Sequence, residues 1–130
     1  MKKEQFRVRK TAAGLGLYTT VPIKKGARII EYTGETITEE EANRRGGRYL
    51  FKLNSKRALD ARRHVHTARY INHSCKPNCI PYLNDPETRV FIFAKRDILG
   101  GEELTYNYGN EYSAEYCVPC KCAECRKKAM

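Results

Sequence analysis

Apolar and polar residues alternate in short runs along the chain, which is the pattern of half-buried β-strands. Phe6 and Val8 alternate with arginines near the start, and the run at 89–94 has apolar side chains on both faces. Glycine, proline and charged turns separate the runs. We predict an edge strand within residues 1–10 and further strands at 15–21, 28–32, 49–53, 58–61 and 89–94, followed by a final segment at 102–108.

One segment, residues 38–45, has the signals of a helix. Thr38 is a suitable N-cap, three glutamates follow it, and arginines occupy the last turn before Gly46. Glu41 stands three residues after Thr38, the spacing of a capping box. Many short strands with a single helix predict a mostly β domain built of several small sheets.

Length and charge narrow the range of functions. A chain of 130 residues is expected to form one domain around one core. Its net charge of +10 suggests an acidic partner such as nucleic acid, although solvated surface lysines and arginines explain it equally well. No apolar run has membrane-spanning length and the basic start has no apolar segment behind it, so we expect an intracellular protein without membrane contact.

The cysteines are concentrated at the end of the chain. Four of the six lie in the last fourteen residues, as Cys117, Cys120, Cys122 and Cys125. Disulfides would need an oxidising compartment, and no export signal supports one. The clustered spacing therefore favours metal thiolates. Cys79 is interpreted as a small buried residue.

The stretch RYINHSCKPNC at 69–79 has the densest polar chemistry in the chain. Asn72 and His73 suit a ligand contact or a backbone turn, and Pro77 prevents a helix. Because buried polar groups need partners, the stretch is either an exposed turn or a site. His64 and His66 lack a third ligand nearby and are expected at the surface.

Three motifs in order resemble those of the SET-domain protein lysine methyltransferases. They are GLG at 14–16, the Asn-His-Ser-Cys run at 72–75, and GEELTYNYG at 101–109. The resemblance extends from about Phe6 to Cys125. It implies a SET domain at 1–112, in which the segments of Asn72 and Tyr108 pack together in a knot-like crossing, and a post-SET-like tail at 113–130.

The resemblance also implies S-adenosylmethionine as methyl donor and assigns residues to it. Tyr108 matches the catalytic tyrosine, Tyr106 the position that limits the number of methyl groups, and Tyr32 a tyrosine of the lysine channel. Each of these could instead be a core aromatic, and the polar motif could be a satisfied turn. The positions implied around the donor are Gly14, Leu15, Gly16, Tyr49, Arg69, Asn72, His73 and Tyr108.

A zinc site follows from the same resemblance, with ligands Cys75, Cys120, Cys122 and Cys125. The chain departs from the family in having two residues instead of four before the last of these cysteines, and Cys117 is extra and could replace one ligand. Asn107 stands where aspartate is common, and no aromatic residue follows the last cysteine.

The leading hypothesis is a protein lysine methyltransferase that adds one or two methyl groups to a histone tail or another basic, nucleic-acid-associated protein. It would work at chromatin in a eukaryotic nucleus or in a bacterial cytoplasm. The alternative is a non-catalytic, zinc-stabilised module that binds chromatin or nucleic acid. A secreted disulfide protein is a third possibility, against which the missing export signal argues.

Overall fold

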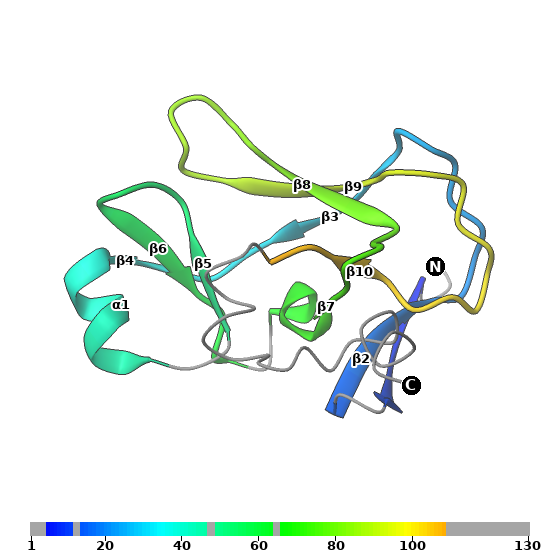
Figure 1. Cartoon of the computed structure of the whole chain (residues 1–130), viewed down its shortest axis with the longest axis horizontal. Coiled ribbons are helices and arrows are strands. Elements are labelled where there is room, and N and C mark those ends of the chain that lie inside the picture. The colour runs from blue at the N-terminus through cyan, green and yellow to red at the C-terminus, as the bar shows by residue number, and fades with distance from the viewer. Residues whose placement is uncertain (1–4, 12–13, 47–48, 64–65, 109–130) are drawn as a thin grey trace. The chain divides into compact units, whose positions relative to one another are not determined.

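The computed structural model describes residues 5–11, 14–46, 49–63 and 66–108. Within these residues the chain forms ten short strands, one α-helix and one 3-10 turn, which confirms a mostly β fold of small sheets (Figure 1). The chain divides into two compact units. The first comprises Met1–Ala27, Tyr70–Ile80 and Phe93–Met130, and the second Arg28–Arg69 and Pro81–Ile92.

An antiparallel hairpin opens the first unit. Strands β1 (Phe6–Thr11) and β2 (Gly14–Thr19) pair from Phe6↔Thr19 to Thr11↔Gly14. Strand β1 thus extends one residue beyond the predicted edge strand, and β2 begins one residue before the strand predicted at 15–21 and ends two residues earlier. Gly14 has φ 106°, a conformation that glycine adopts without strain. On β2, Leu17 and Thr19 are buried, whereas β1 is largely exposed, as expected of an edge strand.

A short parallel pair lies at the centre of the first unit. Strand β7 (Asn72–His73) pairs with β10 (Thr105–Tyr106), so that Thr105 lies opposite Asn72 and Tyr106 opposite His73. The chain before β10 also bonds to β2, with Leu104 N–H donating to the Leu17 carbonyl at 2.8 Å. The predicted packing of the two motif segments is confirmed; the passage of one through a loop stays a prediction.

A three-stranded sheet occupies much of the second unit. Its order is β3-β9-β8, from β3 (Arg28–Tyr32), β9 (Val90–Ala94) and β8 (Cys79–Leu83), and the last two strands run from one unit into the other along the chain. On β9, Val90 and Ile92 are fully buried. The other face, with Phe91 and Phe93, is only half-buried although it is apolar. The Arg28 and Arg89 guanidinium groups each lie 5.0 Å from the Phe91 ring centroid.

The second unit also contains the helix and its own sheet, with order β4-β6-β5. The strands are β4 (Glu35–Thr38), β5 (Leu50–Lys52) and β6 (Arg57–Asp60), and α1 (Glu39–Arg45) packs against β4 and β6 (Figure 1). Ile37, Ala42 and Ala58 form a small apolar core, with Leu50 beside them.

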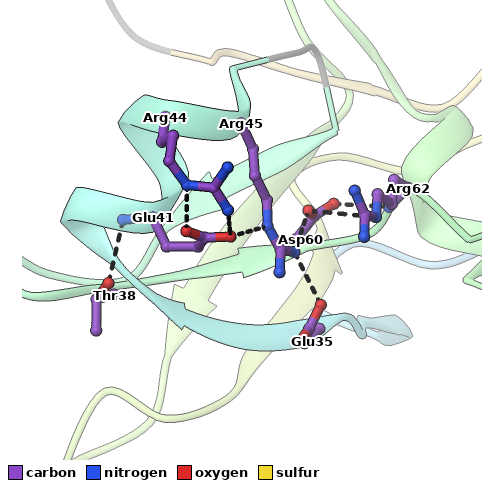
Figure 2. Close-up of polar contacts among 7 residues, drawn as sticks. All are labelled: Glu35, Thr38, Glu41, Arg44, Arg45, Asp60 and Arg62. Carbon is purple, nitrogen blue, oxygen red and sulfur yellow. Dashed lines mark hydrogen bonds and ion pairs between the residues drawn. The ribbon is translucent and has the colours of Figure 1, made fainter.

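Local signals set both ends of α1. The Thr38 hydroxyl accepts the Glu41 N–H at 3.1 Å, which confirms the N-cap. At the other end Gly46, with φ 61°, donates its N–H to the Ala42 carbonyl at 2.9 Å. The second half of the predicted capping box differs, since both oxygens of the Glu41 carboxylate are bonded to Arg44 and Arg45 (Figure 2).

Arg45 is the centre of an ionic cluster (Figure 2). Its guanidinium donates to the carboxylates of Glu35 at 2.8 Å, Glu41 at 2.7 Å and Asp60 at 2.9 Å. Hydrogen bonds from the two arginines lower the pKa of Glu41 to about 2, and the bond from Arg44 contributes more than the bond from Arg45. The cluster ties α1 to strands β4 and β6, with a carboxylate of Asp60 that is only 4% exposed.

The 3-10 turn η1 (Thr67–Tyr70) comes shortly before the Asn-His-Ser-Cys motif. His66 is half-buried, with Nδ1 at 2.8 Å from the Thr33 hydroxyl, so the predicted surface position is only partly met. His64 lies outside the described residues. Among the helices of the described residues, none has the length and apolarity needed to cross a membrane.

Candidate active site

Asn72 is held against the Gly-Leu-Gly strand. Its side-chain amide donates to the Leu15 carbonyl at 2.9 Å and to Glu103 Oε2 at 3.0 Å. The residue is buried. The first two motifs of the sequence, 57 residues apart between Leu15 and Asn72, therefore meet at this side chain.

His73 joins the second motif to the third. Its Nδ1 accepts the Tyr108 backbone N–H at 3.1 Å, and the two rings pack edge to face with centroids 5.5 Å apart. Burial lowers the pKa of His73. A neutral ring whose Nδ1 accepts carries its proton on Nε2, and that atom lies 3.6 Å from Cys75 Sγ.

Two tyrosines of the third motif stack against each other. The ring centroids of Tyr106 and Tyr108 are 4.6 Å apart, and Tyr106 is buried. The Tyr108 hydroxyl donates to the Ile71 carbonyl. Tyr108 is thereby fixed at both ends, through its backbone by His73 and through its hydroxyl by the residue before Asn72.

Two residues of this site are not singled out by the sequence. Asn78 is buried, and its amide donates to the Glu103 carbonyl at 2.8 Å and accepts the Thr105 N–H at 2.9 Å. The Asn78 side chain thus bonds the backbone of the segment before Tyr106 in the way that a neighbouring strand would. Its signal is an Asn directly after Pro77, which indicates a turn but gives no sign of the contact 25 residues away.

Glu103 explains why residue 16 is glycine. A Cβ at Gly16 would lie 2.5 Å from Glu103 Oε2 and 3.1 Å from the Asn72 amide nitrogen. The Thr11 methyl group lies 2.7 Å from the same point, so the ends of the Glu103 and Thr11 side chains would both have to shift to admit a larger residue. The missing Cβ therefore lets the backbone of Gly16 lie close to the protein's own side chains. Its place beside the methyl donor stays a prediction.

The remaining predicted site residues belong to the second unit, where they form two pairs. The Arg69 guanidinium lies 3.8 Å from the Tyr49 ring centroid, which is a close cation–π contact, and donates to the Arg62 carbonyl at 2.7 Å. Tyr32 is buried and packs against Phe51 with centroids 5.2 Å apart.

The two described cysteines have different surroundings. Cys79 is buried, and desolvation raises the pKa of its thiol to about 12, which disfavours the thiolate that a metal needs. Cys75 is exposed and faces an imidazole N–H. Its surroundings fit a metal thiolate whose sulfur also accepts a hydrogen bond from the His73 ring. The described residues contain no cluster of three or more His, Cys, Asp or Glu that could hold a metal, and Cys120, Cys122 and Cys125 lie outside them.

Comparison with known protein families gives a match over most of the chain. The SET domain family matches residues 14–109, which is well over half of the chain. The chain belongs to the SET domain family. Residues 1–13, which include β1, and residues 110–130 lie outside the matched range.

Histone-lysine N-methyltransferases are among its relatives. The enzyme trr of Drosophila melanogaster is 41% identical over 94% of this chain, and 2D of Homo sapiens is 38% identical over 97%. An H3 lysine-4 specific enzyme of Schizosaccharomyces pombe is 40% identical over 83%. The SET domain described here spans only 6%, 2% and 13% of the length of these three relatives.

The chemistry of the first unit suits a cationic ligand with a sulfonium centre. Asn72 and Glu103 supply oxygen acceptors, and residues 14 and 15 are exposed beside them. Acceptors and a carboxylate stabilise positive charge at short range. The residues present therefore fit the methyl donor that the SET domain family uses.

Proposed function

We propose that the chain is a protein-lysine N-methyltransferase that uses S-adenosylmethionine. The observation that carries the proposal is the convergence of three motifs on Asn72, His73 and Tyr108 within one compact unit. Membership of the SET domain family and the names of the relatives support it.

The donor would be held by the backbone of residues 14–16 and by Asn72 and His73, all of which belong to the first unit. For Tyr49 and Arg69, a donor contact stays a prediction from the family resemblance. When bound, it supplies a methyl group that the neutral lysine amine accepts by in-line displacement. The protein's own task is to bind, to orient the amine and to exclude water.

Tyr108 would orient the amine. Its hydroxyl proton is donated to the Ile71 carbonyl, so its oxygen is directed to act as an acceptor for an N–H of the substrate. The His73 contact fixes the backbone behind that hydroxyl. For Tyr32, a place in the lysine channel stays a prediction from the family resemblance.

The substrate we propose to test first is the histone H3 tail, because two relatives are named as H3 lysine-4 specific. The wild-type chain is incubated with S-adenosylmethionine and an H3 peptide, and methylation is measured by mass spectrometry. Tyr108→Phe should lose most of the activity while the donor still binds. Tyr82→Phe, which changes an exposed tyrosine, is the matched control and should retain activity. Full activity in Tyr108→Phe would remove Tyr108 from the mechanism.

Tyr106 would set the number of methyl groups. Its ring is buried against Tyr108, so its hydroxyl narrows the space beside the catalytic ring and favours mono- or dimethylation. Tyr106→Phe removes one oxygen from that space and should shift the product toward trimethyl-lysine. An unchanged product distribution would contradict the size argument.

A zinc ion held by Cys75, Cys120, Cys122 and Cys125 would stabilise a tail at 113–130 that follows the SET domain at 1–112. The exposed Cys75 thiol beside His73 supports this ligand. Cys122→Ser should lower the zinc content measured by atomic absorption, and Cys117→Ser should leave it unchanged. An intact protein without zinc would contradict the proposal.

Strand β1 is the proposed contact with nucleic acid. Arg7, Arg9 and Lys10 are exposed on this edge strand, and no carboxylate of the described residues forms an ion pair with them. Residues two apart on a strand share a face and lie about 7 Å apart, which matches the spacing of successive phosphates. Such a contact, together with a histone substrate, fits a protein that works at chromatin in the nucleus.

A further inference from the structure

The contacts of Asn72 determine which of its two side-chain amide atoms is bound within the protein. Its nitrogen lies within 3.0 Å of two oxygens, the Leu15 carbonyl and Glu103 Oε2. A backbone carbonyl and a carboxylate only accept hydrogen bonds, so the nitrogen must point to them. The Asn72 side-chain oxygen is therefore turned the other way, and no described residue donates to it.

Glu103 is itself held rigidly on three sides. Its carbonyl accepts the Asn78 amide at 2.8 Å, its backbone forms a bridge with Tyr18 on β2, and the next residue donates to the Leu17 carbonyl. The carboxylate then fills the space left by the missing Cβ of Gly16. Its position relative to Asn72 is thus set by the fold.

We infer that Glu103 is a positioning residue that fixes the Asn72 amide so that its oxygen accepts a hydrogen bond from the methyl donor. The inference rests on the proposed function, since it gives Asn72 a donor to bind. The Glu103 carboxylate acts together with the Leu15 carbonyl, and the two acceptors set the orientation of the Asn72 amide.

Two variants at this position, with a control variant elsewhere, separate the acceptor role from packing. Glu103→Gln keeps an acceptor oxygen of the same reach, whereas Glu103→Leu keeps the approximate volume without one. Glu40→Gln removes an exposed carboxylate on α1 and is the control. Loss of a buried hydrogen bond of this kind corresponds to about a tenfold change in affinity.

The expected results are a dissociation constant for S-adenosylmethionine raised about tenfold in Glu103→Leu and within about threefold of wild type in Glu103→Gln. Glu40→Gln should match wild type. At saturating donor, kcat of Glu103→Leu should stay near the wild-type value, because the change acts on binding. Calorimetry and steady-state kinetics measure these quantities. A folded Glu103→Leu variant with wild-type donor affinity, or a Glu103→Gln variant as weak as Glu103→Leu, would overturn the inference.

Two further measurements test the positioning role even if a Glu103 variant does not fold or the protein binds no methyl donor. Side-chain amide hydrogens of Asn72 should exchange slowly with solvent in wild type and in Glu103→Gln, and faster in Glu103→Leu; equal exchange would contradict the positioning role even if no donor binds. Gly16→Ala should weaken donor binding by displacing the carboxylate, and adding Glu103→Leu to it should weaken binding little further, because the acceptor is already displaced. Fully additive losses would contradict the positioning role. A wild-type protein that binds no donor while showing this exchange pattern would refute the proposed function and leave the positioning role intact.

Discussion

Asn78 offers the sharpest test of how the site is held together. Asn78→Ala removes a buried amide that donates to the Glu103 carbonyl and accepts the Thr105 N–H. Each of the two backbone groups left buried and unpaired costs about 1–3 kcal/mol, so the variant should lose about 2–6 kcal/mol of unfolding free energy. That is a large share of the about 5–15 kcal/mol that stabilises a typical domain.

Urea unfolding followed by circular dichroism measures this loss, provided that the m-value is unchanged. Asn43→Ala, at an exposed position of α1, is the control and should not destabilise the protein, because alanine is the better helix former. Donor affinity should also fall in Asn78→Ala, since the segment that carries Glu103 and Tyr106 loses its support. A loss below about 1 kcal/mol would refute the claim that Asn78 holds this segment.

Three further predictions concern charge. Arg45→Met should lower the midpoint of thermal unfolding, because it leaves a nearly buried carboxylate without its closest cation, whereas the exposed Arg44→Met should change it little; equal effects would contradict the cluster. The folded pKa of Glu41, about 2, lies below its ordinary 4.5, so its contribution is present above pH 4.5 and is lost as the pH falls toward 2. Acid unfolding curves of Glu41→Gln should be correspondingly flatter in that window, and superimposable curves would refute this. Replacing Arg7 and Arg9 with glutamine should reduce the salt dependence of duplex DNA binding by a slope of about 2, and an unchanged slope would exclude β1 from the contact.

The elements with local signals could be predicted from the sequence. Thr38 and Gly46 mark the ends of α1 by chemistry that acts within four residues. Strand β8 was not predicted, because Pro81 interrupts its pattern; the proline is tolerated since β8 is an edge strand. Strand β4 was also missed, as four residues directly before the helix give too short a pattern.

The site was predictable only in part, and for a different reason. Convergence of Asn72, His73 and Tyr108 followed from a family resemblance, because hydrogen bonds between residues 35 or 57 apart leave no periodic signal. Glu103 could not be predicted for the same reason, because its partner Asn72 is 31 residues away and the residues before it indicate only a turn. Only the contact with Gly16 and Asn72 gives its carboxylate a role.

The most direct test of the donor site is a titration of the isotope-labelled chain with S-adenosylmethionine, followed by backbone amide resonances. We expect saturable shifts, with the same dissociation constant, in the amide resonances of residues 14–16, of Asn72 and His73 on β7, and of Tyr108. Absence of saturable shifts at β2 and β7 would contradict the assignment of these strands to the methyl-donor site.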